Sequence, residues 1–523
     1  MIWNRLSKSL ALSGICTLLF GVVLKFMLFP KLLKWQMHTK INLKPGSDVR
    51  TLWSNVPFPI DFRIYLFNIT NPDEIKNGKQ PILREVGPYY FVEKHEKTNM
   101  LDHEKHDSVE YATKNTFNFK PENNGDLTGE EELIVPHIFM LSMIMATVRD
   151  KPSALPVVGK AINSIFKNPK NVFVKVKAMD LMFRGLPIDC SVKDFAGAAI
   201  CGLLRGKMDE LIVEDPDHFR FAIFGANNGT TSKNRIKILR GSKNQADIGR
   251  VIEFNGKKNI SIWNDQYCDT LNGTDGYVFP PYLKENEDIY TFSPEICRSL
   301  NLYSIGASEV AGLYSNRYTA WLGDPSINPA LKCYCPSTGC LKAGVMDLHK
   351  CTGIPLVASN PHFYRVHEDY LKMVDGLNPI KDKHETFIDF DLFSGTILQA
   401  KKRLQFNIMI RKLNRFKIMA NFSEVLLPLF WIEEGIILPD EYMSNVKSLH
   451  NIVGIILWIS VALVIVGLNC FVITIFVICR ANKKVRNVIH SPQVGNNMKF
   501  STTRPGPLVC KVNQLRPAKR HSA

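Results

Sequence analysis

IVGIILWISVALVIVGLNCFVITIFVI, residues 452–478, is an uncharged apolar run near the C-terminus of this 523-residue chain. A helix needs about 20 such residues to cross a bilayer core of about 30 Å. The run is long enough to cross with some tilt. We therefore predict a transmembrane helix here, and the rest of the organisation follows outward from it.

A second apolar run, LALSGICTLLFGVVLKFMLF, occupies residues 10–29. Its one charge, Lys25, is near an end of the run, where the long side chain can reach the membrane interface. A cleaved secretory signal is the alternative, but such signals have an apolar part of about 7–15 residues and a small-residue cleavage site. No Ala-x-Ala-like site precedes Pro30. We predict an uncleaved signal anchor, and hence one membrane helix near each end.

Charge indicates the orientation of both helices. The tail at 479–523 carries ten Lys and Arg residues and no Asp or Glu, as cytoplasmic flanks do. Residues 1–29 add three basic residues, so most of the net charge of +16 is at the ends. The charge therefore reflects topology and attraction to anionic membrane lipids, and it gives no support to nucleic-acid binding. We predict a plasma-membrane protein with both termini, 1–9 and 479–523, in the cytoplasm and an extracellular domain at 30–451.

The domain at 30–451 carries signals of the secretory pathway. Five Asn-x-Ser/Thr sites fall within it, at Asn68, Asn228, Asn259, Asn272 and Asn421. N-glycans would keep these positions on the surface. Eight of the twelve cysteines also lie there: Cys190, Cys201, Cys268, Cys297, Cys333, Cys335, Cys340 and Cys351. An even number of cysteines in an oxidising compartment predicts disulfides.

Besides disulfides, the cysteines raise two possibilities, metal binding and acylation. Cys333, Cys335 and Cys340 resemble zinc ligands at first sight, but they lack the paired Cys-x2-Cys spacing. No metal site is predicted. Cys479 stands beside Arg480 at the cytoplasmic boundary, a position typical of palmitoylation, and we predict an acyl group there.

Short β-favouring runs alternate with turn residues through the middle domain, at 62–67, 88–92, 219–224, 235–239 and 405–410. This spacing predicts a mainly β, predominantly antiparallel domain. The exception is 131–184, where long apolar runs at 133–148, 161–166 and 176–183 predict two or three helices. The methionine-rich part at 138–145 is compatible with ordinary core packing or with an adaptable entrance for apolar ligands.

Motifs that signal catalysis are missing from the sequence. It contains no Gly-x-Ser-x-Gly, Gly-x4-Gly-Lys-Ser/Thr or Gly-x-Gly-x2-Gly motif. The nearest string to a metalloprotease motif, HEKH at 103–106, has one residue too few between its histidines to place both on one helical face. We expect no catalytic residues, no cofactor and no enzymatic activity.

Several motifs together resemble the class B scavenger receptors. They are FNITNP (67–72), EVGPY (85–89), NGTD (272–275), FPP (279–281), ICRS (296–299), DGLNP (375–379) and KRLQ (402–405), with Trp263 and Cys268. The resemblance spans nearly the whole chain, including the two end helices. Within the family, LKPGS at 43–47 and PFP at 57–59 are most similar to the insect sensory neuron membrane proteins.

The resemblance implies an antiparallel β-barrel-like domain that is crossed by a hydrophobic tunnel and covered by a helical cap, which would be 131–184. It also implies disulfides that pair Cys268 with Cys333, Cys297 with Cys351, and Cys335 with Cys340. Cys190 and Cys201 fall outside this shared set, and we expect them to pair with each other.

The function implied by the resemblance is capture and transfer without chemistry. By position, Lys167 and Lys170 correspond to cap lysines that attract acidic head groups of ligands in some relatives. The ligand would be a fatty-acid-derived pheromone that passes through the tunnel to the membrane or to an adjacent odorant receptor complex, with ligand-carrier proteins as further partners. A general scavenger receptor for fatty acid, lipid or lipoprotein is the alternative, and an adhesion receptor without a continuous cavity is a third reading.

Overall fold

A computed structural model describes residues 2–206, 211–414 and 416–489. The chain forms two compact units, one made of 1–36 together with 447–523 and the other of 37–446. Most of the predicted cytoplasmic tail lies outside the described residues.

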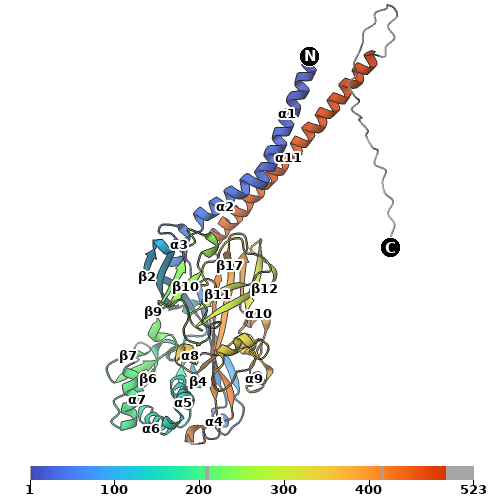
Figure 1. The fold of residues 1–523 in the computed structure, drawn as a ribbon. Helices are drawn as coiled ribbons and strands as arrows, with labels where there is room; N and C mark the ends of the chain where they lie inside the picture. The colour runs from blue at the N-terminus through green and yellow to red at the C-terminus, as the bar shows by residue number, and fades with distance from the viewer. Residues whose placement is uncertain (1, 207–210, 415, 490–523) are drawn as a thin grey trace, which may run out of the picture. The chain divides into compact units, whose positions relative to one another are not determined.

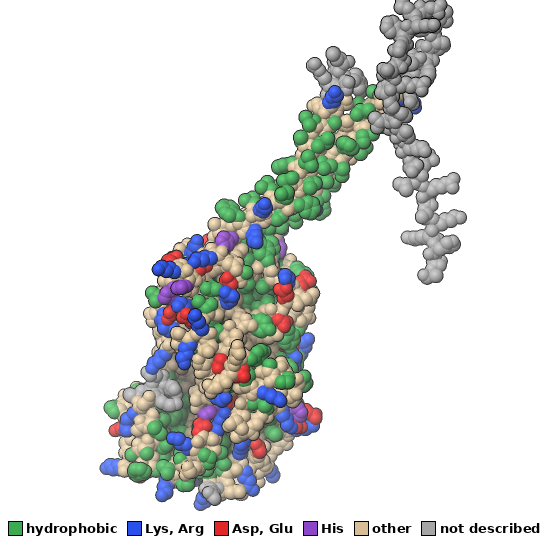
Figure 2. Space-filling model, in the orientation of Figure 1, with side chains coloured by type: hydrophobic (Ala, Val, Ile, Leu, Met, Phe, Trp, Pro, Cys, Tyr) green, Lys and Arg blue, Asp and Glu red, His purple; other side chains and the backbone are tan. Residues whose placement is uncertain are grey.

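The first unit is built from long helices at both ends of the chain (Figure 1). One helical run consists of α1 (Ile2–Val23), a π-helical turn (Leu24–Leu28) and α2 (Phe29–Lys40), and the other is α11 (Asp440–Ile489). Both runs are long and apolar enough to cross a membrane, and Figure 2 shows their side chains as mostly hydrophobic. The apolar stretches at 10–29 and 452–478 are thus helical, and each helix extends beyond its apolar stretch.

Glycines let the two helical runs pack closely. A Cβ at Gly467 would lie 2.6 Å from the Cβ of Leu18, and a Cβ at Gly14 would lie 2.8 Å from the Cβ of Cys470. At Gly21 the nearest atom of the other run would be 3.0 Å away. Small residues allow such close approach between membrane helices, where lipid supplies no hydrophobic drive for association.

Replacing Gly467 by leucine should separate the two helical runs, since the new side chain would overlap Leu18. The measurement is oxidative crosslinking between Cys470 and a cysteine introduced by Gly14→Cys, which should fall markedly when Gly467→Leu is added. Gly454→Leu is the matched control, because a Cβ at Gly454 would meet nothing within 4 Å. Equal crosslinking with the two leucine variants would contradict this packing.

The second unit is organised around a 13-stranded antiparallel sheet. The strands follow the order β10 (Val251–Phe254), β9 (Thr231–Leu239), β3 (Ser108–Phe119), β2 (Leu83–His103), β1 (Ile60–Ile69), β18 (Val425–Ile437), β17 (Thr396–Ile410), β16 (Phe387–Asp391), β13 (Leu313–Ala320), β12 (Arg298–Val310) and β11 (Ile289–Ser293), with β15 (Leu356–Ser359) joining β17 to β14 (Val345–Asp347). The first strand, β1, pairs with the last, β18, so that Asp61 lies opposite Gly435. The chain therefore enters and leaves the sheet at neighbouring positions.

A short loop bridges the two edge strands, so the sheet forms a nearly closed barrel. Beside β10, the Val251 N–H donates to the Gly273 carbonyl (3.0 Å), and beside β11, the Phe292 N–H donates to the Thr274 carbonyl (2.8 Å). Gly273 has a φ of +87°, and a Cβ there would lie 2.0 Å from the Tyr290 carbonyl oxygen. Only glycine fits this position without distortion. The prediction of an antiparallel, barrel-like domain is confirmed.

Gly273→Ala should lower the free energy of unfolding of the domain by more than the cost of a left-handed backbone conformation alone. That conformation costs a residue with a Cβ about 1–2 kcal/mol, and at Gly273 the Cβ would also collide with backbone. Gly256→Ala is the matched control, because Gly256 has a φ of +75° but open space around its Cβ position. Thermal unfolding of the purified variants should show the larger fall in Tm for Gly273→Ala; equal falls would refute the bridging role.

Helices gather at one end of this unit, away from α3 (Asp48–Ser54), as Figure 1 shows. They are α5 (Ile138–Asp150), α6 (Leu155–Ile165) and α7 (Phe195–Arg205). The first two lie within 131–184, as predicted. The helical prediction is wrong at 133–136 and at 176–177, because β4 (Glu132–Pro136) pairs with β5 (Phe173–Lys177). The alternation Phe-Val-Lys-Val-Lys suits a strand once a partner strand lies beside it.

The remaining elements are short. They are α4 (Pro72–Lys76), α8 (His349–Thr352), α9 (Glu368–Lys372), α10 (Lys381–His384) and a small sheet of β6 (Leu186–Asp189), β8 (His218–Phe221) and β7 (Ile212–Val213). The β-favouring runs at 62–67, 88–92, 235–239 and 405–410 fall in β1, β2, β9 and β17, whereas β8 covers only part of 219–224. The largest hydrophobic core lies against β1, β2, β17 and β18 and extends into α5 and α6.

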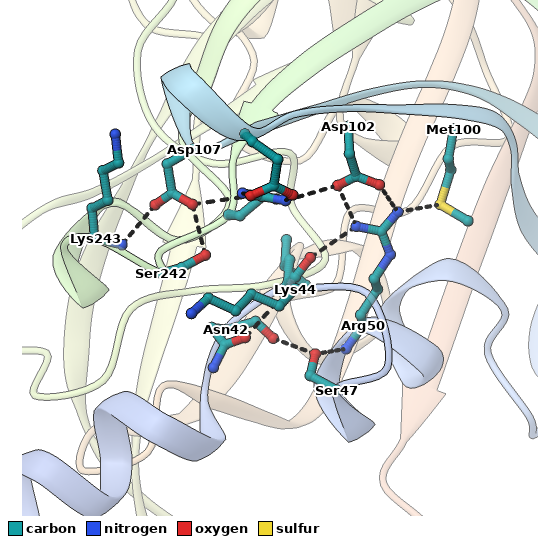
Figure 3. A network of polar contacts seen from close by, with 12 residues as sticks. Asn42, Lys44, Ser47, Arg50, Met100, Asp102, Asp107, Ser242 and Lys243 are labelled. Atoms are coloured by element: carbon teal, nitrogen blue, oxygen red, sulfur yellow. Dashed lines mark hydrogen bonds and ion pairs between the residues drawn. The ribbon is translucent and has the colours of Figure 1, made fainter.

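A network of charged side chains holds the segment before β1 against the β2–β3 hairpin (Figure 3). The Arg50 guanidinium donates to both carboxylate oxygens of Asp102, each at 2.8 Å. Arg240, whose side chain is 2% exposed, pairs with Asp102, Glu104 and Asp107 at 3.2, 2.7 and 3.3 Å. A buried guanidinium is tolerated when several carboxylates surround it in this way.

Candidate functional site

A pocket of about 410 Å³ lies among the elements of the helical cap. This volume is within the ~300–1,000 Å³ typical of small-molecule sites. Its apolar lining comes from Met140, Ile165, Phe166, Pro169, Phe173, Val174, Leu186 and Pro187, and its polar lining from His137, Lys167, Lys170, Asn171 and Asp189. We call it the cap pocket. It brings together both cap lysines that the family resemblance singled out.

Local structure places these residues around the pocket. The His137 side chain accepts the Met140 N–H at 3.4 Å and so caps α5. Its ring packs edge-on against Phe166 at 4.7 Å between centroids. Burial lowers the pKa of His137 to about 4, so the ring is neutral at pH 7. The inner wall of the pocket therefore carries no charge from this histidine.

The rim of the cap pocket is basic. Lys167 and Lys170 are both exposed. The Lys167 ammonium lies 3.4 Å from the Asp189 carboxylate, whereas Lys170 has no ion-pair partner among the described residues. An apolar wall beside an available ammonium suits a molecule with a long hydrocarbon chain and a polar or acidic end.

A group of phenylalanine side chains lines the concave side of the barrel. It consists of Phe62, Phe91, Phe117, Phe119, Phe183, Phe224, Phe406 and Phe430, and neighbouring centroids are 4.5 to 6.1 Å apart. We call it the phenylalanine cluster. Phe62 of β1 and Phe117 of β3 belong to strands that do not pair, yet their centroids are 4.5 Å apart. Side chains two strands apart come this close readily when they share the concave face of a curled sheet.

The sequence analysis missed a second group of side chains in the barrel. The interior ionisable cluster consists of Glu93, His95, Lys97, Tyr277, Glu295, Lys402 and Glu434. Lys402 lies 3.6 Å from Glu434 and 3.7 Å from Glu295. Burial raises the pKa of Glu93 to about 7, and the charge of Lys402 acts in the opposite direction. Because β2 and β17 do not pair, this interaction again indicates the concave face.

A signal for part of this group was present in the sequence. Glu93, His95 and Lys97 alternate along one strand, so period-two geometry places all three on one face. The structure shows that this face of the strand is buried, since these three residues are 3%, 4% and 5% exposed. Sequence alone gives no reason to expect charged residues on the buried face of a strand.

Four disulfides join the eight cysteines of the middle domain in the pairs that the sequence analysis expected. They are Cys190–Cys201, Cys268–Cys333, Cys297–Cys351 and Cys335–Cys340, with Cα–Cα distances of 5.6, 6.1, 5.7 and 4.6 Å. The first links Cys190, which directly follows β6, to Cys201 of α7. The other three link the connections around β11 to β15. With their sulfurs paired in this way, Cys333, Cys335 and Cys340 do not form a zinc site.

The five predicted glycosylation sites differ in exposure. The exposed asparagines are Asn259, Asn272 and Asn421, and the half-buried ones are Asn68 and Asn228. The Oδ1 atoms of Asn68 and Asn228 accept the N–H groups of Ile134 and Phe117, each at 2.8 Å. The exposed three lie openly on the surface, and all five stay predictions.

The other residues singled out in the sequence fall outside these sites. HEKH at 103–106 ends β2 and forms a short 3₁₀ turn, in which Glu104 pairs with Arg240. It therefore belongs to the charged network and does not form a helix with two histidines on one face. Cys479 lies in α11, and its acylation stays a prediction.

Comparison with known proteins agrees with this architecture. The model of the CD36 family matches residues 12–478. Sensory neuron membrane protein 1 of Apis mellifera is 47% identical over 458 residues, which cover 87% of this chain and 88% of that protein. Proteins of the same name from Antheraea polyphemus and Pediculus humanus subsp. corporis are each 40% identical over 446 residues, covering 84% and 85% of this chain and 85% and 86% of their own. With its nearly closed antiparallel barrel and two apolar end helices, this chain belongs to the CD36 family, the class B scavenger receptors, and it resembles the insect sensory neuron membrane proteins.

Proposed function

We propose that this protein is a cell-surface receptor or co-receptor in insect olfaction that captures fatty-acid-derived pheromones. The cap pocket receives the ligand, and the barrel interior conducts it to the membrane or to an adjacent odorant receptor complex. The observation that carries the proposal is the cap pocket itself, where an apolar wall stands beside Lys167 and Lys170. The name and high identity of the sensory neuron relatives support the sensory role.

The driving force for capture is the burial of hydrocarbon. Each methylene removed from water contributes about 0.8 kcal/mol, so a chain of ~12–16 carbons gains several kcal/mol by entering an apolar site. No covalent step is needed. Release then requires a second apolar environment, which the outer leaflet or a neighbouring receptor supplies.

The proposed route continues from the cap into the barrel. The largest hydrophobic core is continuous from the cap residues Met140 and Phe173 to Phe62, Phe91 and Phe430 of the phenylalanine cluster. A hydrocarbon chain that passed between these side chains would stay out of water, while the two end helices keep the protein in the membrane. This path would be the hydrophobic tunnel implied by the family resemblance.

The proposed setting is the plasma membrane of a sensory neuron dendrite or of a support cell. Both termini would be cytoplasmic, and the glycans and disulfides would face the extracellular fluid. Carrier proteins that bring the ligand and an odorant receptor complex that accepts it are the proposed partners. Acylation of Cys479 would add a further membrane contact, and hydroxylamine-sensitive acyl label that is lost in Cys479→Ser would support it.

Uptake of lipoprotein or fatty acid is the alternative function. A general scavenger receptor expressed in cultured cells would internalise these particles, whereas the sensory role predicts transcripts confined to antennal neurons or their support cells. Expression in gut or haemocytes would favour the scavenger role.

Reversing both rim charges tests the cap pocket. Lys167→Glu with Lys170→Glu should weaken the binding of long-chain acids by about tenfold or more, because two attractive charges become repulsive. Binding is measured on the purified full-length protein with a radiolabelled fatty acid. Lys160→Glu is the matched control, since Lys160 is an exposed cap lysine that does not line the pocket. Equal affinities in the double variant and the control would argue against docking at this rim.

Deleting the gene tests the function as a whole. Pheromone-evoked spikes recorded from single olfactory neurons should be strongly reduced, and responses of neurons tuned to small polar odorants should be preserved. A wild-type transgene should restore the response. An undiminished pheromone response in the deletion animal would remove the proposed role.

A further inference from the structure

Three polar atoms of the interior ionisable cluster are buried without a hydrogen-bond partner among the described residues. They are Lys97 Nζ, His95 Nε2 and Glu93 Oε2. A buried polar group left unpaired is destabilising, so native proteins nearly always supply a partner. Three such atoms on alternate residues of β2 therefore indicate a place where a further molecule, either water or a ligand, completes the hydrogen bonds.

Open space adjoins other members of the cluster. Lys402, Glu295 and Glu434 retain 44%, 53% and 20% of their side-chain exposure. Burial is nevertheless the largest influence on the pKa of each of these groups. Side chains that lie deep in the protein and are still accessible to solvent line an internal space. The interior ionisable cluster thus faces room that a ligand group could occupy.

Two members of the cluster, His95 and Lys97, can supply hydrogen-bond donors. Burial lowers the pKa of His95 to about 3, so its ring is neutral, and its Nδ1 lies 3.3 Å from the Tyr277 hydroxyl and 3.5 Å from Glu93 Oε1. When that hydroxyl donates to Nδ1, the ring proton sits on Nε2, which becomes a donor. Burial lowers the pKa of Lys97 to about 8, so at pH 7 the side chain is mostly an ammonium with three N–H donors.

Neighbouring groups hold the Lys97 charge without accepting these hydrogen bonds. The Tyr277 ring centroid lies 3.8 Å from Nζ, and the Trp53 ring centroid lies at 5.2 Å, both within cation–π range. The Asp275 Oδ2 atom already accepts from Trp53 Nε1 (2.7 Å) and from the Tyr111 hydroxyl (2.9 Å). The ammonium is therefore stabilised in place while its N–H donors stay unpaired.

The phenylalanine cluster begins next to these donors. Phe91 precedes Glu93 on the same face of β2, and Phe117 lies opposite Glu93 on β3. The same change from aromatic to charged side chains occurs along alternate positions of two further strands. It runs from Phe406 to Lys402 on β17 and from Phe430 to Glu434 on β18. One face of the sheet therefore carries an aromatic zone that ends at a polar zone.

We propose that the interior ionisable cluster binds the carbonyl oxygen of a long-chain ligand whose hydrocarbon chain lies along the phenylalanine cluster. The inference rests on the proposed function, because it requires such a ligand to enter the barrel. Lys97 Nζ and His95 Nε2 donate to the carbonyl oxygen. Esters, aldehydes and acids share this group, and a hydrocarbon of equal length lacks it.

The test compares binding of radiolabelled methyl palmitate and hexadecane to the purified full-length protein. Lys97→Met keeps the length of the side chain and removes its donors, so it should weaken ester binding about tenfold and leave hexadecane binding unchanged. Lys97→Arg should restore part of the ester affinity. Palmitic acid is the third probe, and a loss confined to the acid would assign the site to carboxylates and overturn the carbonyl assignment.

Two further variants keep the test decisive. Lys94→Met is the matched control, because Lys94 lies on the same strand, its side chain is 50% exposed, and it pairs with Glu96 at 2.9 Å; it should alter neither affinity. Tyr277→Phe keeps the ring beside Lys97 and removes only the hydroxyl that orients His95. If Lys97→Met does not fold, Tyr277→Phe should still show a loss confined to the ester.

The remaining outcomes separate the two hypotheses. An equal loss for ester and hexadecane in Lys97→Met, or unchanged ester binding, would overturn this inference, since Lys97 would then serve packing alone or be satisfied by water. Both results leave ligand capture intact. A wild-type protein that binds neither probe would overturn the proposed function together with this inference.

Discussion

The pairing of the first strand with the last is the constraint on which the barrel unit, residues 37–446, depends. β1 and β18 lie side by side at the middle of the sheet, and each has a second partner, β2 and β17. Their register places Asp61 opposite Gly435, so the chain reaches and leaves the barrel at adjacent points. Long-range pairing of this kind can form only after some 370 residues have been brought together, which makes the barrel a property of the whole domain and not of any segment.

Closing the sheet has a chemical consequence for its concave face. The interior of a barrel is enclosed, so side chains that point inward must pair with one another, with water or with a bound molecule. The phenylalanine cluster meets this requirement through ring packing. The interior ionisable cluster meets it only in part, because Lys402 is paired with carboxylates whereas Lys97 Nζ is not hydrogen-bonded to any described residue.

The cap and the barrel interior present related chemistry in different forms. At the cap pocket, charge lies on the exposed rim and the wall beside it is apolar. In the barrel, charge lies in the enclosed polar zone and an aromatic zone leads toward it. A ligand with a long chain and one oxygen-bearing end suits both arrangements. Exposed charge favours encounter, since it acts over a distance set by ionic strength, whereas enclosed donors favour discrimination between ligands, since an unmatched polar group there is destabilising.

The sequence by itself determined the two membrane helices, the mainly β character of the domain and the family motifs. These depend on local properties: the length of an apolar run, the alternation of side chains along a strand, and short motifs such as NGTD at 272–275. The helical prediction failed where it reached the strand Phe-Val-Lys-Val-Lys, because pairing with a neighbouring strand, and not local propensity, decides the conformation there. Only the tertiary structure decided that Lys167 and Lys170 border one pocket and that Glu93, His95 and Lys97 face Tyr277 and Lys402. Those neighbours come from strands and loops far apart in the chain, and the curvature that joins them is set by the closure of the whole sheet.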